Sequence, residues 1–278
     1  MKNKRSVAIA GTLIVICLLL PLCGKHLKRN AYDIVVFGDS IMAGVYEDKT
    51  VPELLGELSG CRVLNAAFGG TTMAYLNEGA YAGNNRAFFS MYSLSEAVKY
   101  NDFSLIEMSS LASHDFTDDL WKSQVEVISK ADIRKAKIVV IEHGCNDYQS
   151  GVRIENAENP FDKNTYSGAL RCAVENIRKG APDAAIVLMT PVFNHIEEYD
   201  ACNIQDFGGG TLNEYVEAMK KVASEYGLTF VDNYSESGIN EENYTEYLAD
   251  GVHLTDKGSR LIADKLWNEI ETLVNNQR

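Results

Sequence analysis

After residue 31 the chain alternates short apolar segments with helical patterns, and this alternation constrains the fold more than any other feature. Each apolar segment is bounded by turn-forming residues, as buried strands are. The candidate strands are residues 33–37, 62–66, 137–141, 185–189 and 228–232. The candidate helices are residues 52–58, 165–179, 212–226 and 256 to about 274. Strands that alternate with helices form parallel sheets covered on both faces, so the pattern predicts one α/β domain over residues 31–278.

A long excursion separates the second predicted strand from the third. Residues 71–136 exceed what a simple crossover needs, so we expect an insertion around residues 73–136. Residues 104–110 fit either an extra strand or a helix. The first part of the excursion is rich in aromatic residues, namely Tyr75, Tyr81, Phe88, Phe89 and Tyr92. These rings could form a wall for sugar rings near an active site, but we favour their packing inside an inserted subdomain.

The first thirty residues form a separate unit, a membrane anchor or signal segment. Residues 6–24 are an uncharged, mostly apolar run flanked by basic residues, and their length reaches the threshold for a membrane span. We favour an uncleaved anchor over a cleaved signal, because residues 20–24 offer no clean cleavage site. Lipidation at Cys23 is a lesser alternative, since Leu22 stands where a lipoprotein motif requires a small residue. The basic residues on the two flanks are equal in number, so they do not decide the orientation, and the free amino terminus favours an amino terminus inside the cell. The domain is then expected outside the cytoplasm, either anchored by this segment or secreted after its cleavage.

Charge and cysteine content restrict the partners. Six of the 26 basic residues lie in the first thirty positions, which hold no acid, so the rest carries 20 basic and 39 acidic residues, a net charge of −19. Such a surface repels polyanions, which argues against nucleic acid and leaves neutral or cationic substrates open. The six cysteines show no C-x-x-C spacing, so we interpret them as buried thiols and predict no metal site; one disulfide is an alternative outside the cell.

The predicted strand at residues 33–37 leads directly into Gly38-Asp39-Ser40. Ser40 is therefore expected at the carboxyl edge of a parallel sheet, where open α/β folds bind ligands, and it is a candidate nucleophile. Such a serine needs a base and a group that orients the base. Among the five histidines, His253 alone has an aspartate three residues before it. Asp250 can fold back onto the Nδ1–H group of His253 and leave Nε2 to accept the serine proton.

Two further strand ends offer donors for an oxyanion. After the second strand, Gly69 and Gly70 can present a backbone N–H group with no side chain in front of it. After the third strand, Asn146 offers a neutral amide, which can stabilise a transition state without binding the ground state too tightly. From the residues alone, either glycine could be the donor.

These four blocks, in this order, resemble the SGNH hydrolases, also called the GDSL family of esterases and lipases. The blocks are Gly38-Asp39-Ser40-Ile41, Asn65-Ala66-Ala67-Phe68-Gly69-Gly70, Gly144-Cys145-Asn146-Asp147 and Asp250-Gly251-Val252-His253, and the resemblance covers about residues 32–275. It implies a flavodoxin-like three-layer α/β/α sandwich with a mostly parallel five-stranded sheet. It also implies Ser40 as nucleophile, His253 as base and Asp250 as the orienting residue, with no cofactor. The implied oxyanion hole comprises the Ser40 and Gly70 N–H groups and the Asn146 side chain; the family spacing from Asn65 favours Gly70.

The other titratable residues near these blocks have simpler interpretations. We expect Asp39 to hold the turn by hydrogen bonding, and Asp147 to position the Asn146 loop. His143 could contact substrate, but we favour a structural role. Glu142 with His143 does not predict a metal site, because no second histidine stands at helical spacing.

The sequence therefore predicts a serine esterase that hydrolyses small acyl esters, acetyl above all, on carbohydrate through an acyl-enzyme. An acyltransferase with the same triad is an alternative, since only the acceptor differs. A non-catalytic, membrane-tethered glycan-binding module is another, although the intact set of Ser40, Asn146, Asp250 and His253 argues against it. The oligomeric state is left open.

Overall fold

The computed structural model describes residues 29–77, 85–112, 119–196 and 204–277. Its centre is one five-stranded sheet in the order β2-β1-β3-β4-β5, in which every neighbouring pair is parallel. This order is that of the flavodoxin-like fold, and the predicted α/β fold class is confirmed. The strands are β1 (Ile34–Gly38), β2 (Val63–Asn65), β3 (Ile138–Glu142), β4 (Ala185–Met189) and β5 (Thr229–Val231).

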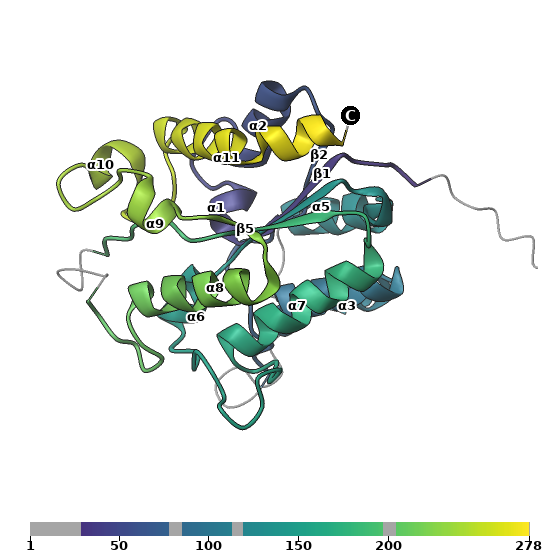
Figure 1. Ribbon diagram of the computed structural model, residues 1–278, viewed down its shortest axis with the longest axis horizontal. Coiled ribbons are helices and arrows are strands. Elements are labelled where there is room, and N and C mark those ends of the chain that lie inside the picture. Colours follow the sequence, from purple (N-terminus) through teal and green to yellow (C-terminus); the bar gives the residue numbers. More distant parts are fainter. Residues whose placement is uncertain (1–28, 78–84, 113–118, 197–203, 278) are drawn as a thin grey trace, which may run out of the picture.

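Helices cover both faces of the sheet. On one face lie α11 (Asp256–Asn276), α2 (Val51–Ser59) and the short α1 (Ser40–Ala43); on the other lie α3 (Met91–Tyr100), α7 (Tyr166–Gly180) and α8 (Leu212–Tyr226) (Figure 1). Alternate residues of each strand point to opposite faces of the sheet, where they form two hydrophobic cores beneath the two layers of helices. Val35 and Phe37 pack on the α7 and α8 side, whereas Ile34 and Val36 pack on the α11 side.

The helix boundaries follow from capping. Thr50 and Glu53 form a capping box that starts α2, and Thr211 and Glu214 form another that starts α8. Helix α8 stops at Gly227, whose φ of 62° is a left-handed conformation that glycine adopts without strain. The predicted helix at residues 212–226 therefore matches the structure at both ends.

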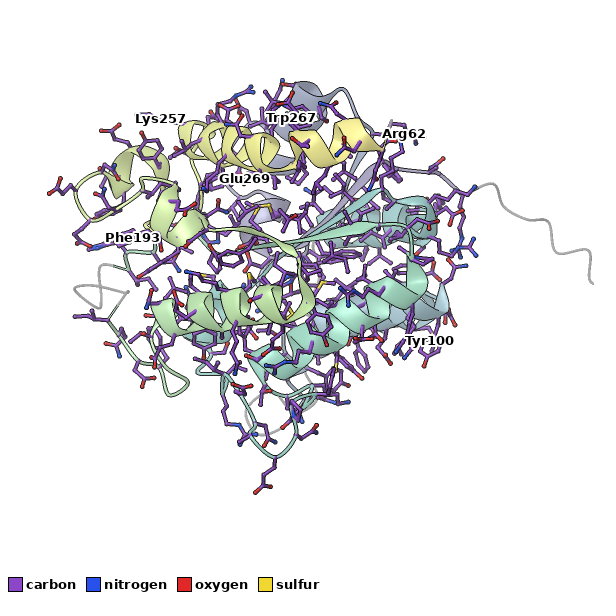
Figure 2. All side chains as sticks on the ribbon, in the orientation of Figure 1. Arg62, Tyr100, Phe193, Lys257, Trp267 and Glu269 are labelled. Atoms are coloured by element: carbon purple, nitrogen blue, oxygen red, sulfur yellow. The ribbon has the colours of Figure 1, made fainter. Side chains whose placement is uncertain are left out.

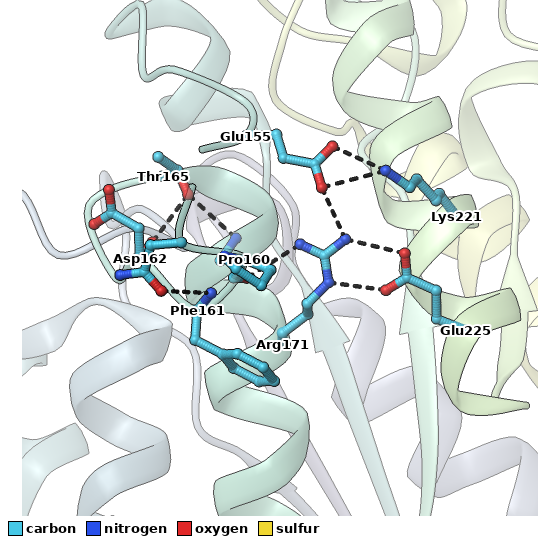
Figure 3. Close-up of polar contacts among 10 residues, drawn as sticks. Glu155, Pro160, Phe161, Asp162, Thr165, Arg171, Lys221 and Glu225 are labelled. Carbon is cyan, nitrogen blue, oxygen red and sulfur yellow. Dashed lines mark hydrogen bonds and ion pairs between the residues drawn. The ribbon is translucent and has the colours of Figure 1, made fainter. Parts of the chain in front are cut away.

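A buried arginine ties α7 to α8. The Arg171 side chain donates to both oxygens of Glu225 at 2.8 and 3.0 Å and to Glu155 at 3.1 Å, and Lys221 completes the network (Figure 3). The guanidinium also donates to the carbonyl of Pro160. Because Arg171 is almost fully buried, this pairing satisfies a charge that would otherwise destabilise the fold.

The excursion between β2 and β3 is mostly helical. It contains α3 and, in addition, η2 (Asn85–Phe89), α4 (Ser104–Ala112), α5 (Asp119–Ser129) and η3 (Ile133–Lys135). The undecided segment at residues 104–110 is thus a helix. The aromatic residues mainly pack, as we favoured: Phe89 is fully buried against Phe68 and Trp121. Tyr81 lies outside the described residues.

Three other aromatic residues from the first part of the excursion line a cavity that does not include Ser40. Tyr75, Phe88 and Tyr92 border a hollow of about 400 Å³ that extends to Tyr100. Figure 2 shows Tyr100 at the opposite end of the molecule from Phe193, which follows the carboxyl end of β4. The excursion therefore does not place these rings as a wall around the predicted nucleophile.

The N-terminal prediction is not tested by the structure. Residues 6–24 lie outside the described residues, and among the helices that are described none is long and apolar enough to cross a membrane. Of the six cysteines, Cys61, Cys145 and Cys172 are described and are not in disulfides. Cys145 is buried, whereas Cys61 and Cys172 are half-buried.

Candidate active site

Ser40 stands at the point where β1 turns into α1. All five residues of β1 are buried, and the strand ends at Gly38. A Cβ atom on Gly38 would lie 2.5 Å from the side chain of Met42, so the turn is tight enough to require glycine. The Asp39 side chain accepts a hydrogen bond from the backbone N–H of Ile41 at 3.0 Å and caps the helix. This local geometry places Ser40 at the carboxyl edge of the sheet.

His253 and Asp250 lie beside Ser40, although 210 residues or more separate them along the chain. The Oγ atom of Ser40 is 2.9 Å from Nε2 of His253. Nδ1 of the same ring is 2.7 Å from Oδ2 of Asp250. The carboxylate thus favours the tautomer that carries hydrogen on Nδ1, which leaves Nε2 to accept the serine proton. Partial burial acts to raise the pKa of Asp250, but the hydrogen bonds from His253 outweigh it and lower that pKa.

The loop that carries His253 forms a closely packed turn. Asp250 accepts hydrogen bonds from the backbone N–H groups of Val252 at 3.0 Å and His253 at 2.8 Å. Gly251 between them has φ of 82°, and its carbonyl accepts a hydrogen bond from the N–H of His195 at 2.7 Å. The loop after β4, which contains His195, therefore fixes the position of the candidate base.

The predicted oxyanion donors border the same cavity. Ser40, Gly69, Gly70, Asn146 and His253 all line a hollow of about 560 Å³. Both candidate glycines are present, so the cavity itself does not decide between their N–H groups. The Asn146 side chain donates from Nδ2 to Oδ2 of Asp39 at 3.0 Å, which uses one of its two N–H groups and sets the plane of the amide. Asp39 therefore does more than hold the turn: it links Ser40 to Asn146.

Asp147 connects the two donor loops. Its carboxylate is fully buried and accepts hydrogen bonds from the backbone N–H groups of Met73 at 2.7 Å and Ala74 at 3.0 Å. These contacts join the start of α6 (Cys145–Gln149), which carries Asn146, to the loop that follows Gly70. The arrangement agrees with the positioning role expected for Asp147.

An unusual layer of buried titratable groups lies beneath the site. Burial raises the pKa of Asp39 to about 6 and that of Asp147 to about 7. Glu142, the neighbour of Gly38 in the sheet register, is fully buried, and burial raises its pKa well above the ordinary value. Neither Glu142 carboxylate oxygen has a hydrogen-bond partner within the described residues. The charged form of Glu142 would be buried and unpaired, which is the physical cause of this shift in its pKa.

His143 is a structural residue in this arrangement. It is fully buried, its Nε2 atom lies 3.4 Å from Oγ1 of Thr71, and burial lowers its pKa to about 3. It lines neither of the cavities that contain Ser40. No group of three or more His, Cys, Asp or Glu side chains that could hold a metal is found in the part of the chain that the structure describes.

No sequence motif points to three residues that the excursion contributes to the site. Arg86 of η2 lines the cavity of about 560 Å³, and Trp121 of α5 lines it as well. Trp121 and Gln124 also line a second cavity of about 300 Å³ that contains Ser40. Arg86, Trp121 and Gln124 belong to no local motif, because only the tertiary packing of the excursion brings them beside Ser40.

The comparisons with known proteins agree with this geometry. The model of the GDSL-like Lipase/Acylhydrolase family matches residues 100–261. The chain belongs to this family. The matched segment includes Asn146, Asp250 and His253 and begins after Ser40, so the position of Ser40 beside them comes from the structure.

Relatives and solved structures extend the likeness. The human isoamyl acetate-hydrolyzing esterase 1 homolog is 28% identical over 142 residues, which are 49% of this chain and 56% of that protein. The chain thus spans about half the length of this curated relative. A protein from Lactobacillus plantarum shares the fold with a TM-score of 0.60 at 15% identity, covering 88% of this chain and 99% of its own. A possible lipase from Chitinophaga pinensis does so with a TM-score of 0.54 at 19% identity, covering 87% and 98%.

Proposed function

We propose that this family member is a serine esterase that uses Ser40 as its nucleophile. The observation that carries the proposal is the continuous set of contacts from Ser40 through His253 to Asp250, with distances of 2.9 and 2.7 Å. A serine, an imidazole and a carboxylate in this order form the arrangement that activates a hydroxyl for attack on an acyl carbonyl.

Each residue has a defined role in the proposed reaction. The Oγ atom of Ser40 attacks the ester carbonyl carbon while Nε2 of His253 accepts the hydroxyl proton. The resulting imidazolium gives that proton to the departing alcohol oxygen, and the acyl group stays on Ser40. A water molecule then attacks the acyl-enzyme with His253 again as base, which releases the acid and restores the serine. Asp250 orients the ring and stabilises its charged form throughout.

Negative charge develops on the carbonyl oxygen of the substrate during the attack, and hydrogen-bond donors around that oxygen stabilise it. The backbone N–H groups of Ser40 and Gly70 and the side chain of Asn146 are the proposed donors. The hydrogen bond from Asn146 to Asp39 supports this role, because it fixes the amide before substrate arrives. Donors that are already oriented need no reorganisation during the reaction, which is the basis of their catalytic effect.

For the substrate, we propose small acyl esters, acetyl in particular, on carbohydrate. The name of the human relative refers to hydrolysis of an acetate ester, which supports a small acyl group. The smaller of the two cavities at Ser40, about 300 Å³, has room for a small acyl group.

The proposed nucleophile is tested by comparing Ser40→Ala with Ser104→Ala, which changes an exposed serine at the start of α4. Ser40→Ala is expected to lower kcat/KM for 4-nitrophenyl acetate by about 10⁴-fold or more and to abolish labelling by a fluorophosphonate probe. Ser104→Ala should behave as the unaltered protein. Full hydrolysis by folded Ser40→Ala protein would refute the function, and faster cleavage of long-chain lipid esters than of acetylated sugars would refute the substrate class.

A further inference from the structure

The first described residues lie at the edge of the sheet opposite Ser40. Arg29 donates a hydrogen bond to the side chain of Asn101, and Asn30 forms a parallel bridge with Ala131. Asn30 precedes β1 and Ala131 precedes β3, so this is the edge where the strands begin, here called the amino edge. Ser40 follows the other end of β1, whose five residues separate the two edges by roughly 16 Å.

A short segment joins the amino edge to the apolar run at residues 6–24. Residues 25–28 separate this run from Arg29, so the path from Gly24 to Arg29 comprises five residue steps. Fully extended, this path spans at most about 18 Å, whereas a domain of this size is roughly 45 Å across. An anchor at residues 6–24 therefore keeps the amino edge close to the bilayer.

Exposed apolar side chains gather at the same edge and form what we call the apolar patch. Its members Tyr100, Leu105 and Met108 are 65, 54 and 66% exposed. Tyr100 adjoins Asn101, the partner of Arg29, and the cavity of about 400 Å³ is bordered by both Tyr100 and Leu105. Met108 follows Leu105 by three residues on α4, so these two side chains lie on one face of the helix. Exposed apolar side chains that cluster in this way mark contact surfaces for proteins or membranes.

The charge of the amino edge favours a membrane. Residues 31–278 carry a net charge of −19, but residues 130–137, which directly precede β3, hold four basic residues and one acid. The four basic side chains are 41–69% exposed, and each pairs with an acid: Lys130, Arg134, Lys135 and Lys137. Exposed ion pairs are weak, so these cations can also attract the phosphates of lipid headgroups. Figure 2 shows Arg62, which directly precedes β2, at the same end of the molecule as Tyr100.

We propose that Tyr100, Leu105 and Met108 rest on the lipid bilayer in which residues 6–24 anchor the chain. The amphipathic ring of Tyr100 suits the boundary between lipid and water, and Leu105 and Met108 suit the apolar layer beneath it. The basic side chains of residues 130–137 then face the lipid headgroups.

Ser40 lies at the opposite edge of the sheet and therefore opens away from the bilayer. The esters within its reach are those of solutes or polymers beyond the membrane rather than those of the membrane lipids. This orientation depends on the anchor expected at residues 6–24 and not on the reaction at Ser40.

Tryptophan reporters in the full chain, reconstituted in vesicles, test this orientation. The vesicles contain phosphatidylcholine and phosphatidylglycerol in equal parts, with either ordinary acyl chains or brominated ones, which quench tryptophan only at close range. Leu105→Trp and Met108→Trp each place a reporter in the apolar patch. Tyr46→Trp is the matched reporter near the other edge, because Tyr46 is 60% exposed and its ring centroid lies 5.9 Å from that of His253.

The two patch variants are expected to lose fluorescence in brominated vesicles beyond the loss of the unaltered protein, which has two tryptophans. Tyr46→Trp should show no such additional loss. Unchanged kcat/KM of Leu105→Trp and Met108→Trp for 4-nitrophenyl acetate would show that both are folded, since these exposed residues line neither cavity at Ser40.

Three results would overturn the proposed membrane contact. The first is a full chain that does not sediment with the vesicles, because the anchor would then be missing. The second is vesicle-bound protein in which the patch variants are not quenched, or in which Tyr46→Trp is quenched as strongly as they are. The third is emission from the patch variants that shifts to shorter wavelengths with rising protein concentration and without quenching, which would assign the patch to a second copy of the chain.

Failure of the membrane contact can be told apart from failure of the proposed function. In each of these three cases, hydrolysis that depends on Ser40 would still support the esterase. Full activity of Ser40→Ala protein would instead refute the esterase and leave the quenching pattern as it is.

Discussion

Replacement of Gly251 by alanine is expected to disable the site through a backbone clash rather than through loss of a functional group. A Cβ atom at this position would lie 1.7 Å from the carbonyl oxygen of His195. Real Cβ contacts essentially never fall below 3.0 Å, so the two loops would have to separate by about 1.3 Å. That shift would move His253, which is two residues away and 2.9 Å from Ser40.

The expected loss follows from this displacement. A misplacement of about 1 Å in a catalytic group can lower the rate about 10²-fold, so kcat/KM of Gly251→Ala should fall by roughly that factor or more. Alanine at φ of 82° also destabilises the fold by about 1 to 2 kcal/mol, because left-handed backbone is unfavourable for residues with a Cβ atom.

Gly238 provides a matched control. Its φ is also 82°, but a Cβ atom there would have no neighbour within 4 Å. Gly238→Ala therefore carries the same conformational penalty without the clash. We expect its melting temperature to be a few degrees lower, since about 1 kcal/mol shifts Tm by roughly 2–4 °C in a domain of this size. Its kcat/KM should be unchanged.

The assay measures kcat/KM for 4-nitrophenyl acetate, fluorophosphonate labelling and thermal unfolding for both variants. Gly251→Ala protein that is folded yet retains kcat/KM within about threefold of the unaltered enzyme would refute the reasoning. So would an equal loss of activity in Gly238→Ala, because the left-handed backbone would then suffice to explain the effect.

Two further predictions concern the donor and the buried layer. Asn146→Ala should lower kcat by about 10²- to 10³-fold with little change in KM, since its amide is the proposed donor to the charge that develops in the transition state. A change confined to KM would contradict this role. His143→Leu should reduce acid sensitivity. The folded-state pKa of His143, about 3, lies below the unfolded value of 6.5, so the unfolded chain binds the extra proton and stability is lost as pH falls below 6.5. Between pH 7 and pH 5.0 this contribution of His143 amounts to about 2 kcal/mol. Urea unfolding at the two pH values should show it as a change of that size in the stability difference between the unaltered protein and the variant, because all other titrating groups are common to both.

Much of the fold could be predicted because its signals are local. Each strand is a short apolar run bounded by turn residues, and the helix at residues 212–226 carries its own capping box and its terminal glycine. The segment at residues 104–110 could not be assigned in this way. Its apolar residues fit both the spacing of a helix and that of a strand, and only packing within the excursion makes it part of α4.

The candidate triad could be predicted for a similar reason. Ser40 and Asn146 each follow a strand, and Asp250 stands three residues before His253. Parallel strands place their carboxyl ends at one edge of the sheet, so motifs at those ends meet without further information. This rule does not decide whether the N–H group of Gly69 or that of Gly70 is the oxyanion donor, because both glycines border the same cavity.

The sequence by itself determined the α/β class, the strand ends and the residue types suited to acyl transfer, since propensity, capping and turn chemistry act over a few neighbouring residues. Only the tertiary structure decided what surrounds Ser40. Arg86 and Trp121 reach the site from the excursion, and Asp39 is linked to Asn146 across 107 positions. Such contacts depend on how distant segments pack, and packing leaves no periodic trace in the chain.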